Sequence, residues 1–132
     1  MKDSGQDIYK SLMRMMLPED LLDFFDVVDF REELTGDTVC GGWPEKILHI
    51  YLDENDNAHC ADEGYRPNGY TEETLLNDFP IRDRKAVLHI RRRRWTDPEG
   101  HNEVLDYGEL LGAEGTRLSR ELAAFLKGTY RQ

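Results

Sequence analysis

The hydrophobic positions of the first quarter of the chain have the spacing of helices and then of a strand. Four apolar residues fall on one side of a helix predicted over residues 6–16: Ile8, Leu12, Met15 and Met16. This stripe either packs on the core or forms a contact surface for a partner. A second helix is predicted to begin at residues 17–20, where Pro18 and two acids suit a first turn. Residues 27–34 alternate, which predicts a strand ending in a turn at 35–37.

Two later stretches alternate between apolar and other residues, with the apolar residues on the corresponding face. In residues 47–53 one face carries Leu48, Ile50 and Leu52, and in residues 86–95 Leu88 and Ile90 continue that pattern. The triplet Leu-His-Ile occurs in both stretches, which indicates that the two strands share a sheet. The Gly41-Gly42 pair is assigned to a loop. The polar segment 59–77 is predicted to be the longest loop, with a short helical turn at 71–76.

The last third of the chain is predicted to form a hairpin followed by a helix. A turn at 96–100 leads to a short return strand within 101–107. The helix covers 116–127 and ends at Gly128, with an apolar face made of Leu118, Leu122, Phe125 and Leu126. The sequence therefore predicts an α+β fold with a small antiparallel sheet, N-terminal helices and a C-terminal amphipathic helix, in a single domain over 1–132.

Composition places this domain outside the membrane. The 132 residues contain no apolar run near the length of a membrane span, and the first residues lack the apolar stretch of a signal peptide. Two cysteines are too few for a disulfide scaffold. We therefore predict a cytoplasmic protein with reduced thiols and no membrane partner.

One basic segment lies in a strongly acidic chain. The net charge is −10, yet residues 82–94 hold seven of the 17 Lys and Arg residues against one acid, so the remainder sums to −16. These candidate phosphate contacts are Arg82, Arg84, Lys85, Arg91, Arg92, Arg93 and Arg94. Arginine suits phosphate because its donors form a planar fork. The alternative is a solvated basic face paired with neighbouring acids.

Strand alternation divides these cations between two faces. Arg92 and Arg94 follow Ile90, whereas Arg91, Arg93 and Trp95 fall on the opposite face. Trp95 either stacks on a base or anchors the strand in the core. The predicted last helix adds a second, weaker basic strip that includes Arg117 and Arg120.

The sequence predicts neither an enzyme nor a cofactor. It contains no nucleophile motif, no glycine-rich phosphate loop and no recognisable acid and base pair. The potential metal ligands lack the spacing of a zinc site: Cys40, Cys60, His59 and His101.

An ordered set of motifs gives a family resemblance from about Leu17 to the end of the chain. The motifs are Leu17-Pro18, Leu21 to Phe25, His49 to Glu54, Asp78 to Arg82, Leu88 to Trp95, Gly115 to Arg117 and Glu121 to Lys127. Together they resemble the N-terminal-region protein of the ISAon-type insertion-sequence transposases. Such proteins come from a reading frame just ahead of the one that encodes the catalytic subunit.

The segment from Asp78 to Trp95 is also similar to the amino-terminal region of ISL-type transposases, in which a zinc ribbon serves DNA binding. Here Thr96 to Glu99 stand where those relatives have cysteines. The resemblance therefore implies a zinc-ribbon-like sheet without a metal. It also implies a non-catalytic accessory protein of the bacterial cytoplasm, because the chain is too short for the ribonuclease-H-like catalytic domain of such transposases. Its expected partners are element-end DNA and the separately encoded catalytic subunit.

A second interpretation remains open. The acidic body could dock onto the catalytic subunit as a protein-interaction module that does not itself touch DNA. A third, mimicry of DNA by the acidic surface, fits the net charge but not the arginine strand.

Overall fold

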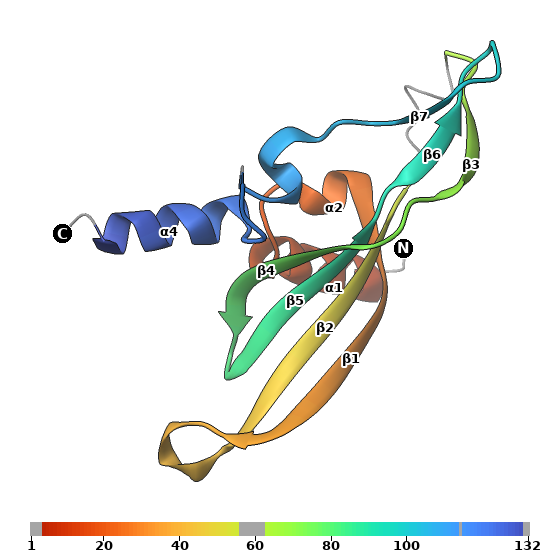
Figure 1. The fold of residues 1–132 in the computed structure, drawn as a ribbon. Coiled ribbons are helices and arrows are strands. Elements are labelled where there is room, and N and C mark those ends of the chain that lie inside the picture. The colour runs from red at the N-terminus through yellow and green to blue at the C-terminus, as the bar shows by residue number, and fades with distance from the viewer. Residues whose placement is uncertain (1–3, 56–62, 114, 131–132) are drawn as a thin grey trace.

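The computed structural model describes residues 4–55, 63–113 and 115–130, and it has the α+β fold that the sequence predicts (Figure 1). The elements in chain order are α1 (Ser4–Met16), α2 (Leu21–Phe24), β1 (Phe25–Thr38), η1 (Cys40–Gly42), β2 (Pro44–Glu54), β3 (Arg66–Tyr70), β4 (Thr74–Ile81), β5 (Arg84–Arg91), β6 (Arg93–Thr96), β7 (Asn102–Val104), η2 (Gly108–Leu111) and α4 (Arg120–Tyr130).

The strands form two sheets. The larger has the order β1-β2-β5-β4 and the smaller has the order β3-β6-β7. The prediction that residues 47–53 and 86–95 share a sheet is confirmed, since β2 pairs with β5. This pair is parallel, whereas the other pairs are antiparallel, so the predicted antiparallel sheet holds with one exception. In the parallel register Ile50 lies beside Leu88 and Leu52 beside Ile90.

The prediction of one strand over 86–95 is wrong, because the chain changes sheets at Arg92. β5 ends at Arg91 and β6 begins at Arg93. At the break, the Thr71 N–H donates to the Arg92 carbonyl at 2.8 Å, and the Arg92 N–H donates to Thr71 Oγ1 at 3.1 Å. Thr71 itself lies between β3 and β4. The segment from β3 to β4 and the segment from β5 to β6 thus pass between the two sheets side by side.

Two predicted turns are also wrong. β1 continues through 35–37, where the register with β2 is irregular and Gly36 has a φ of 91°. The chain reverses instead around η1, which contains the predicted Gly41-Gly42 loop. The helical turn predicted at 71–76 does not form, because β4 pairs with β5 from Thr74 onward and β3 occupies part of the predicted loop.

The predicted helices exist with different bounds. α4 begins at Arg120 rather than at residue 116, because Ser119 caps it: the Leu122 N–H donates to Ser119 Oγ at 3.3 Å. α4 also continues past Gly128 to Tyr130. Phe125 on its predicted apolar face is exposed, whereas Ala123 is buried. The predicted return strand is confirmed over a shorter length as β7.

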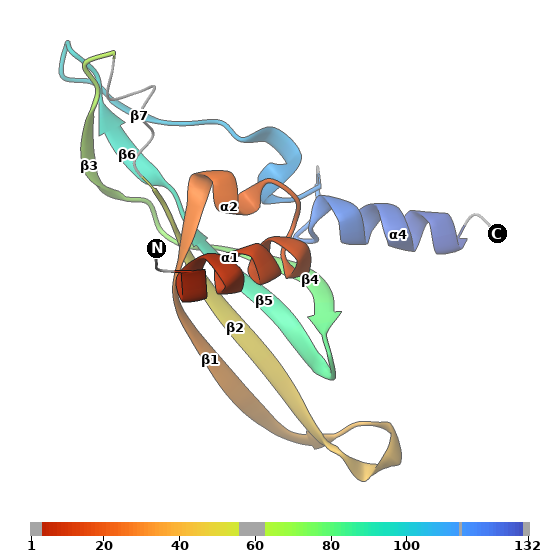
Figure 2. The same cartoon turned by 180° about the vertical axis from the view of Figure 1, so that it is seen from behind.

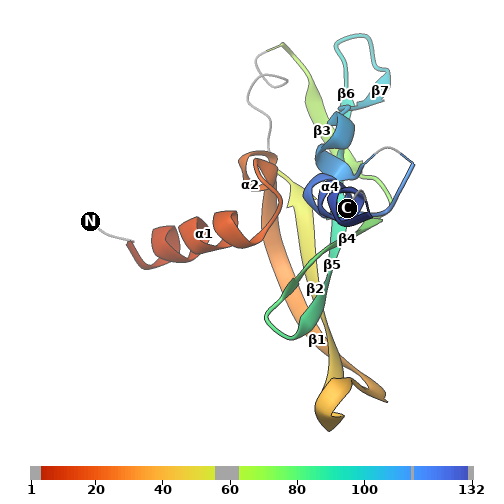
Figure 3. The same cartoon turned by 90° about the vertical axis from the view of Figure 1, so that its left-hand side faces the viewer.

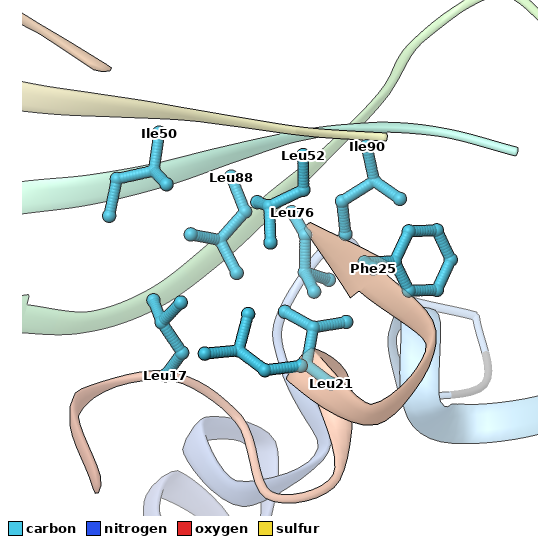
Figure 4. Packing of buried hydrophobic residues seen from close by; sticks show 9 residues of the cluster. Leu17, Leu21, Phe25, Ile50, Leu52, Leu76, Leu88 and Ile90 are labelled. Atoms are coloured by element: carbon cyan, nitrogen blue, oxygen red, sulfur yellow. The ribbon is translucent and has the colours of Figure 1, made fainter. Parts of the chain in front are cut away.

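The core lies between the larger sheet and the segment that joins α1 to β1 (Figure 4). Leu17, Leu21 and Phe25 pack from the helical side. The sheet contributes the buried residues Ile50, Leu52, Leu76, Leu88 and Ile90. The predicted inward face of residues 47–53 is therefore confirmed, and apolar burial of this kind is the main stabilising term of the domain.

Candidate nucleic-acid interface

Three of the candidate phosphate contacts form ion pairs within the larger sheet. Arg84 donates to Glu32 and, at 2.9 Å, to Asp83, while Lys85 lies 3.1 Å from Glu45. Arg91 binds both carboxylate oxygens of Asp53, at 2.7 and 2.6 Å. Hydrogen bonds from Thr35 and then from Lys85 lower the pKa of Glu45, and the bond to Asp53 raises the pKa of Arg91. These cations are therefore neutralised locally.

Two further candidates, Arg93 and Trp95, join the two sheets, and Arg92 contacts the segment after β7. The buried Glu54 carboxylate accepts the Arg93 N–H at 2.9 Å and the Trp95 Nε1–H at 3.4 Å. The Arg93 guanidinium donates to the Tyr70 hydroxyl at 2.8 Å and lies 4.9 Å above the centre of that ring. Arg92 donates to the Leu105 carbonyl at 3.5 Å.

Trp95 is 1% exposed, so it is an anchor of the β6 strand in the interior. Its ring has no face open to a nucleic-acid base. The guanidinium groups of Arg91 and Arg93 both lie over the Tyr70 ring, and that of Arg93 also lies 5.9 Å from the centre of the Trp95 ring, so these three side chains are close together.

Four exposed candidates have no side-chain hydrogen bond or ion pair with the described part of the chain: Arg82, Arg94, Arg117 and Arg120. They lie in three places in Figure 1: the turn between β4 and β5, strand β6, and the start of α4. Arg82 adopts a positive φ of 63° in its turn. Of the ten predicted residues, these four are the exposed cations without a side-chain partner in the described part of the chain, and they do not lie on one strand.

A row of polar side chains on the outer face of the larger sheet was missed by sequence analysis. Glu33 contacts His49 Nε2 at 2.7 Å, His49 Nδ1 lies 2.7 Å from His89 Nε2, and His89 Nδ1 lies 2.8 Å from Glu73. Tyr51 stacks on His89 with ring centres 4.3 Å apart. The repeated Leu-His-Ile triplet was the signal, because each histidine points away from the core face. All four ring nitrogens are engaged, so the row is a closed polar network.

The Asp78 motif at the start of the basic segment has a structural role. The buried Ser119 hydroxyl donates to Asp78 Oδ1 at 2.7 Å, and the Ser119 N–H donates to the Asn77 carbonyl at 2.8 Å. Burial raises the pKa of Asp78, and the Ser119 hydrogen bond offsets part of that rise. Asp78 therefore holds the start of α4 against β4.

Within residues 4–55, 63–113 and 115–130, no three His, Cys, Asp or Glu side chains are grouped to hold a metal ion. Cys40 is exposed, and His101 lies 3.3 Å from Asp97. The other two candidate ligands, His59 and Cys60, lie outside the described residues.

None of the helices in the described parts of the chain combines the length and the apolar character required to cross a membrane.

No family model matches the chain, and no curated protein or solved structure matches it significantly.

Proposed function

We propose that the chain is a non-catalytic accessory protein of a bacterial insertion-sequence transposase that contacts element-end DNA. The resemblance supports this assignment, and three of its motifs supply buried residues of the framework: Leu21, Ile50, Leu88 and Trp95. These motifs therefore coincide with buried positions of the fold.

The observation that carries the DNA contact is the division of the cations into paired and unpaired groups. Arg84 and Arg91 are bound to carboxylates, whereas Arg82, Arg94, Arg117 and Arg120 are exposed without such partners among the described residues. Phosphate binding releases counterions, and each neutralised phosphate adds about 0.9 to the slope of log affinity against log salt. Four contacts predict a loss of about a hundredfold between about 50 and 200 mM salt.

The test compares two double variants with equal changes in charge. Arg94→Gln/Arg120→Gln should lower the salt slope for a duplex carrying the element end by about 2. The matched control Arg84→Gln/Arg91→Gln should leave the slope near the wild-type value, because those cations are already neutralised. Equal losses in both variants, or binding without salt dependence, would refute phosphate contact through the unpaired cations.

A second candidate is docking onto the catalytic subunit without DNA contact, and the residual charge of −16 outside residues 82–94 favours it. Co-purification with the protein encoded downstream separates the two. A complex that survives in the Arg94→Gln/Arg120→Gln variant while DNA binding is lost favours the DNA-binding assignment. A complex with a wild-type chain that shows no affinity for DNA favours docking alone.

A further inference from the structure

The core face of the larger sheet is covered over only part of its length. Phe30, Ile50 and Leu88 are neighbours on this face in three adjacent strands. Ile50 and Leu88 are buried, but Phe30 is 71% exposed, and Leu34 farther along β1 is also exposed. Figure 2 shows α1 and α2 over one part of the sheet, with β1 and β2 extending well beyond them. An apolar sheet face is normally covered by a second layer, and here that layer is incomplete.

A groove of about 540 Å³ lies between the end of α1 and this uncovered face. Its walls include Met13 and Met16 from α1, Val28 and Phe30 from β1, and Ile81 from β4. Unbranched methionine side chains adapt to different apolar partners. The groove therefore has an adaptable wall on its helical side and an apolar floor formed by the sheet.

The apolar stripe of α1 continues the same surface. The spacing of this stripe is compatible with packing on the core or with contact to a partner, and Ile8, Leu12 and Met15 are exposed. Figure 3 shows α1 projecting away from the sheet. Met16 belongs both to this stripe and to the groove wall, so the two apolar surfaces are continuous at the end of α1.

Acidic side chains outnumber basic ones around the groove. Asp29 is the charged residue that lines the groove itself. An adjoining notch next to α1 is lined by Asp26 and Lys10, and a second notch at the end of α1 is lined by Glu19, Asp78, Glu121 and Arg14. A second copy would bring the same acids against these and carry its own charge of −10. Charge complementarity therefore favours a basic occupant over self-association.

A helix fits this position better than a strand. β1 is an edge strand, but its register with β2 is irregular at two points, between Val27 and Asp29 and between Leu34 and Thr38. Such irregularities disfavour the addition of a strand at an edge. A helix lying on the sheet beside α1 would complete the missing layer.

We propose that this groove binds a basic amphipathic helix of a partner protein. The apolar side of the helix packs on Phe30, Val28 and Met16. Its Lys or Arg side chains face Asp29 in the groove and the acids of the adjoining notches, Asp26, Glu19 and Glu121. The proposal localises the docking candidate described above, and it does not depend on DNA contact. A failure of DNA binding would leave it intact.

The experiment measures binding of two labelled helical peptides of about 18 residues by fluorescence anisotropy with the full chain. Both peptides carry the same leucine face, and their polar faces carry either lysine or glutamate. The lysine peptide should bind at least about tenfold more tightly, and its advantage should shrink as salt is added. Phe30→Ser should weaken its binding at least about tenfold, because a large apolar contact is removed.

The matched control is Trp43→Ser, since Trp43 is 70% exposed at the far end of the β1–β2 hairpin and lies outside the groove. This variant should bind like the wild type, and circular dichroism should show both variants folded. Equal binding of the two peptides, or the same loss in both variants, would overturn the proposal. A dimer that Phe30→Ser dissociates would also overturn it, because a second copy would then occupy the groove.

Discussion

Glu54 should be the most sensitive polar residue of this fold, because its buried carboxylate connects the two sheets. It accepts the Tyr107 hydroxyl at 2.7 Å, the Arg93 N–H at 2.9 Å and the Trp95 Nε1–H at 3.4 Å. Hydrogen bonds to a charged group contribute about 1.5–3 kcal/mol each, and buried donors left without an acceptor carry a further cost. The first two bonds are short and the third is weak. We expect Glu54→Ala to lower the free energy of unfolding by about 3–5 kcal/mol.

The assay is urea unfolding followed by circular dichroism. With a slope of about 2 kcal/mol per M, the loss corresponds to a shift of the midpoint by about 2 M. Glu54→Gln should have a smaller effect, since one acceptor oxygen remains. The Glu54/Tyr107 double-mutant cycle, with Tyr107→Phe, should show coupling of at least about 0.5 kcal/mol.

Glu99→Gln is the matched control, because Glu99 is exposed and its hydrogen bond in the turn comes from its backbone N–H rather than from its carboxylate. It should change the unfolding free energy by less than about 0.5 kcal/mol. A loss below about 1 kcal/mol in Glu54→Ala would show that this carboxylate does not hold the sheets together.

Two further predictions concern Asp78 and the tryptophans. Burial raises the pKa of the Asp78 carboxyl group above its ordinary value of 3.8, so the folded state binds the carboxyl proton more tightly than the unfolded state does. The stability that this proton contributes is complete below pH 3.8 and is lost as the pH rises from 3.8 through the pKa of the folded state. In urea unfolding measured at several pH values from 3.8 upward, the Asp78→Asn variant should become more stable relative to the wild type as the pH rises. A difference in stability that does not change with pH would contradict a raised pKa for Asp78. Acrylamide should quench fluorescence strongly in Trp95→Phe, which keeps the exposed Trp43, and weakly in Trp43→Phe, which keeps the buried Trp95. Similar quenching of the two variants would contradict the burial of Trp95.

The sequence predicted those parts of the fold in which alternation is regular. Leu48, Ile50 and Leu52 lie on one face of β2 because each second residue of a strand points the same way. The segment Thr71-Glu72-Glu73-Thr74 resembled a helix start, yet pairing of β4 with β5 outweighs that local preference. The stripe on α1 was visible, but periodicity cannot show which surface covers it.

The candidate site was less predictable because it depends on distant pairs. Arg84 meets Glu32 and Arg91 meets Asp53 only through the register of the sheet. Four consecutive arginines also have no hydrophobic period, so nothing in the run itself marks the break at Arg92. The Glu33–His49–His89–Glu73 row likewise required the β2–β5 pairing.

The break at Arg92 has a consequence for how sequence specifies alignment. Sliding the chain by one position between Arg91 and Arg94 replaces arginine by arginine at most places, so the run does not define its own register. The defining residues are those at its two ends, Ile90 in the core of the larger sheet and Trp95 beside Glu54. A repetitive segment can therefore pass from one sheet to another because distinctive neighbours fix where it starts and where it stops.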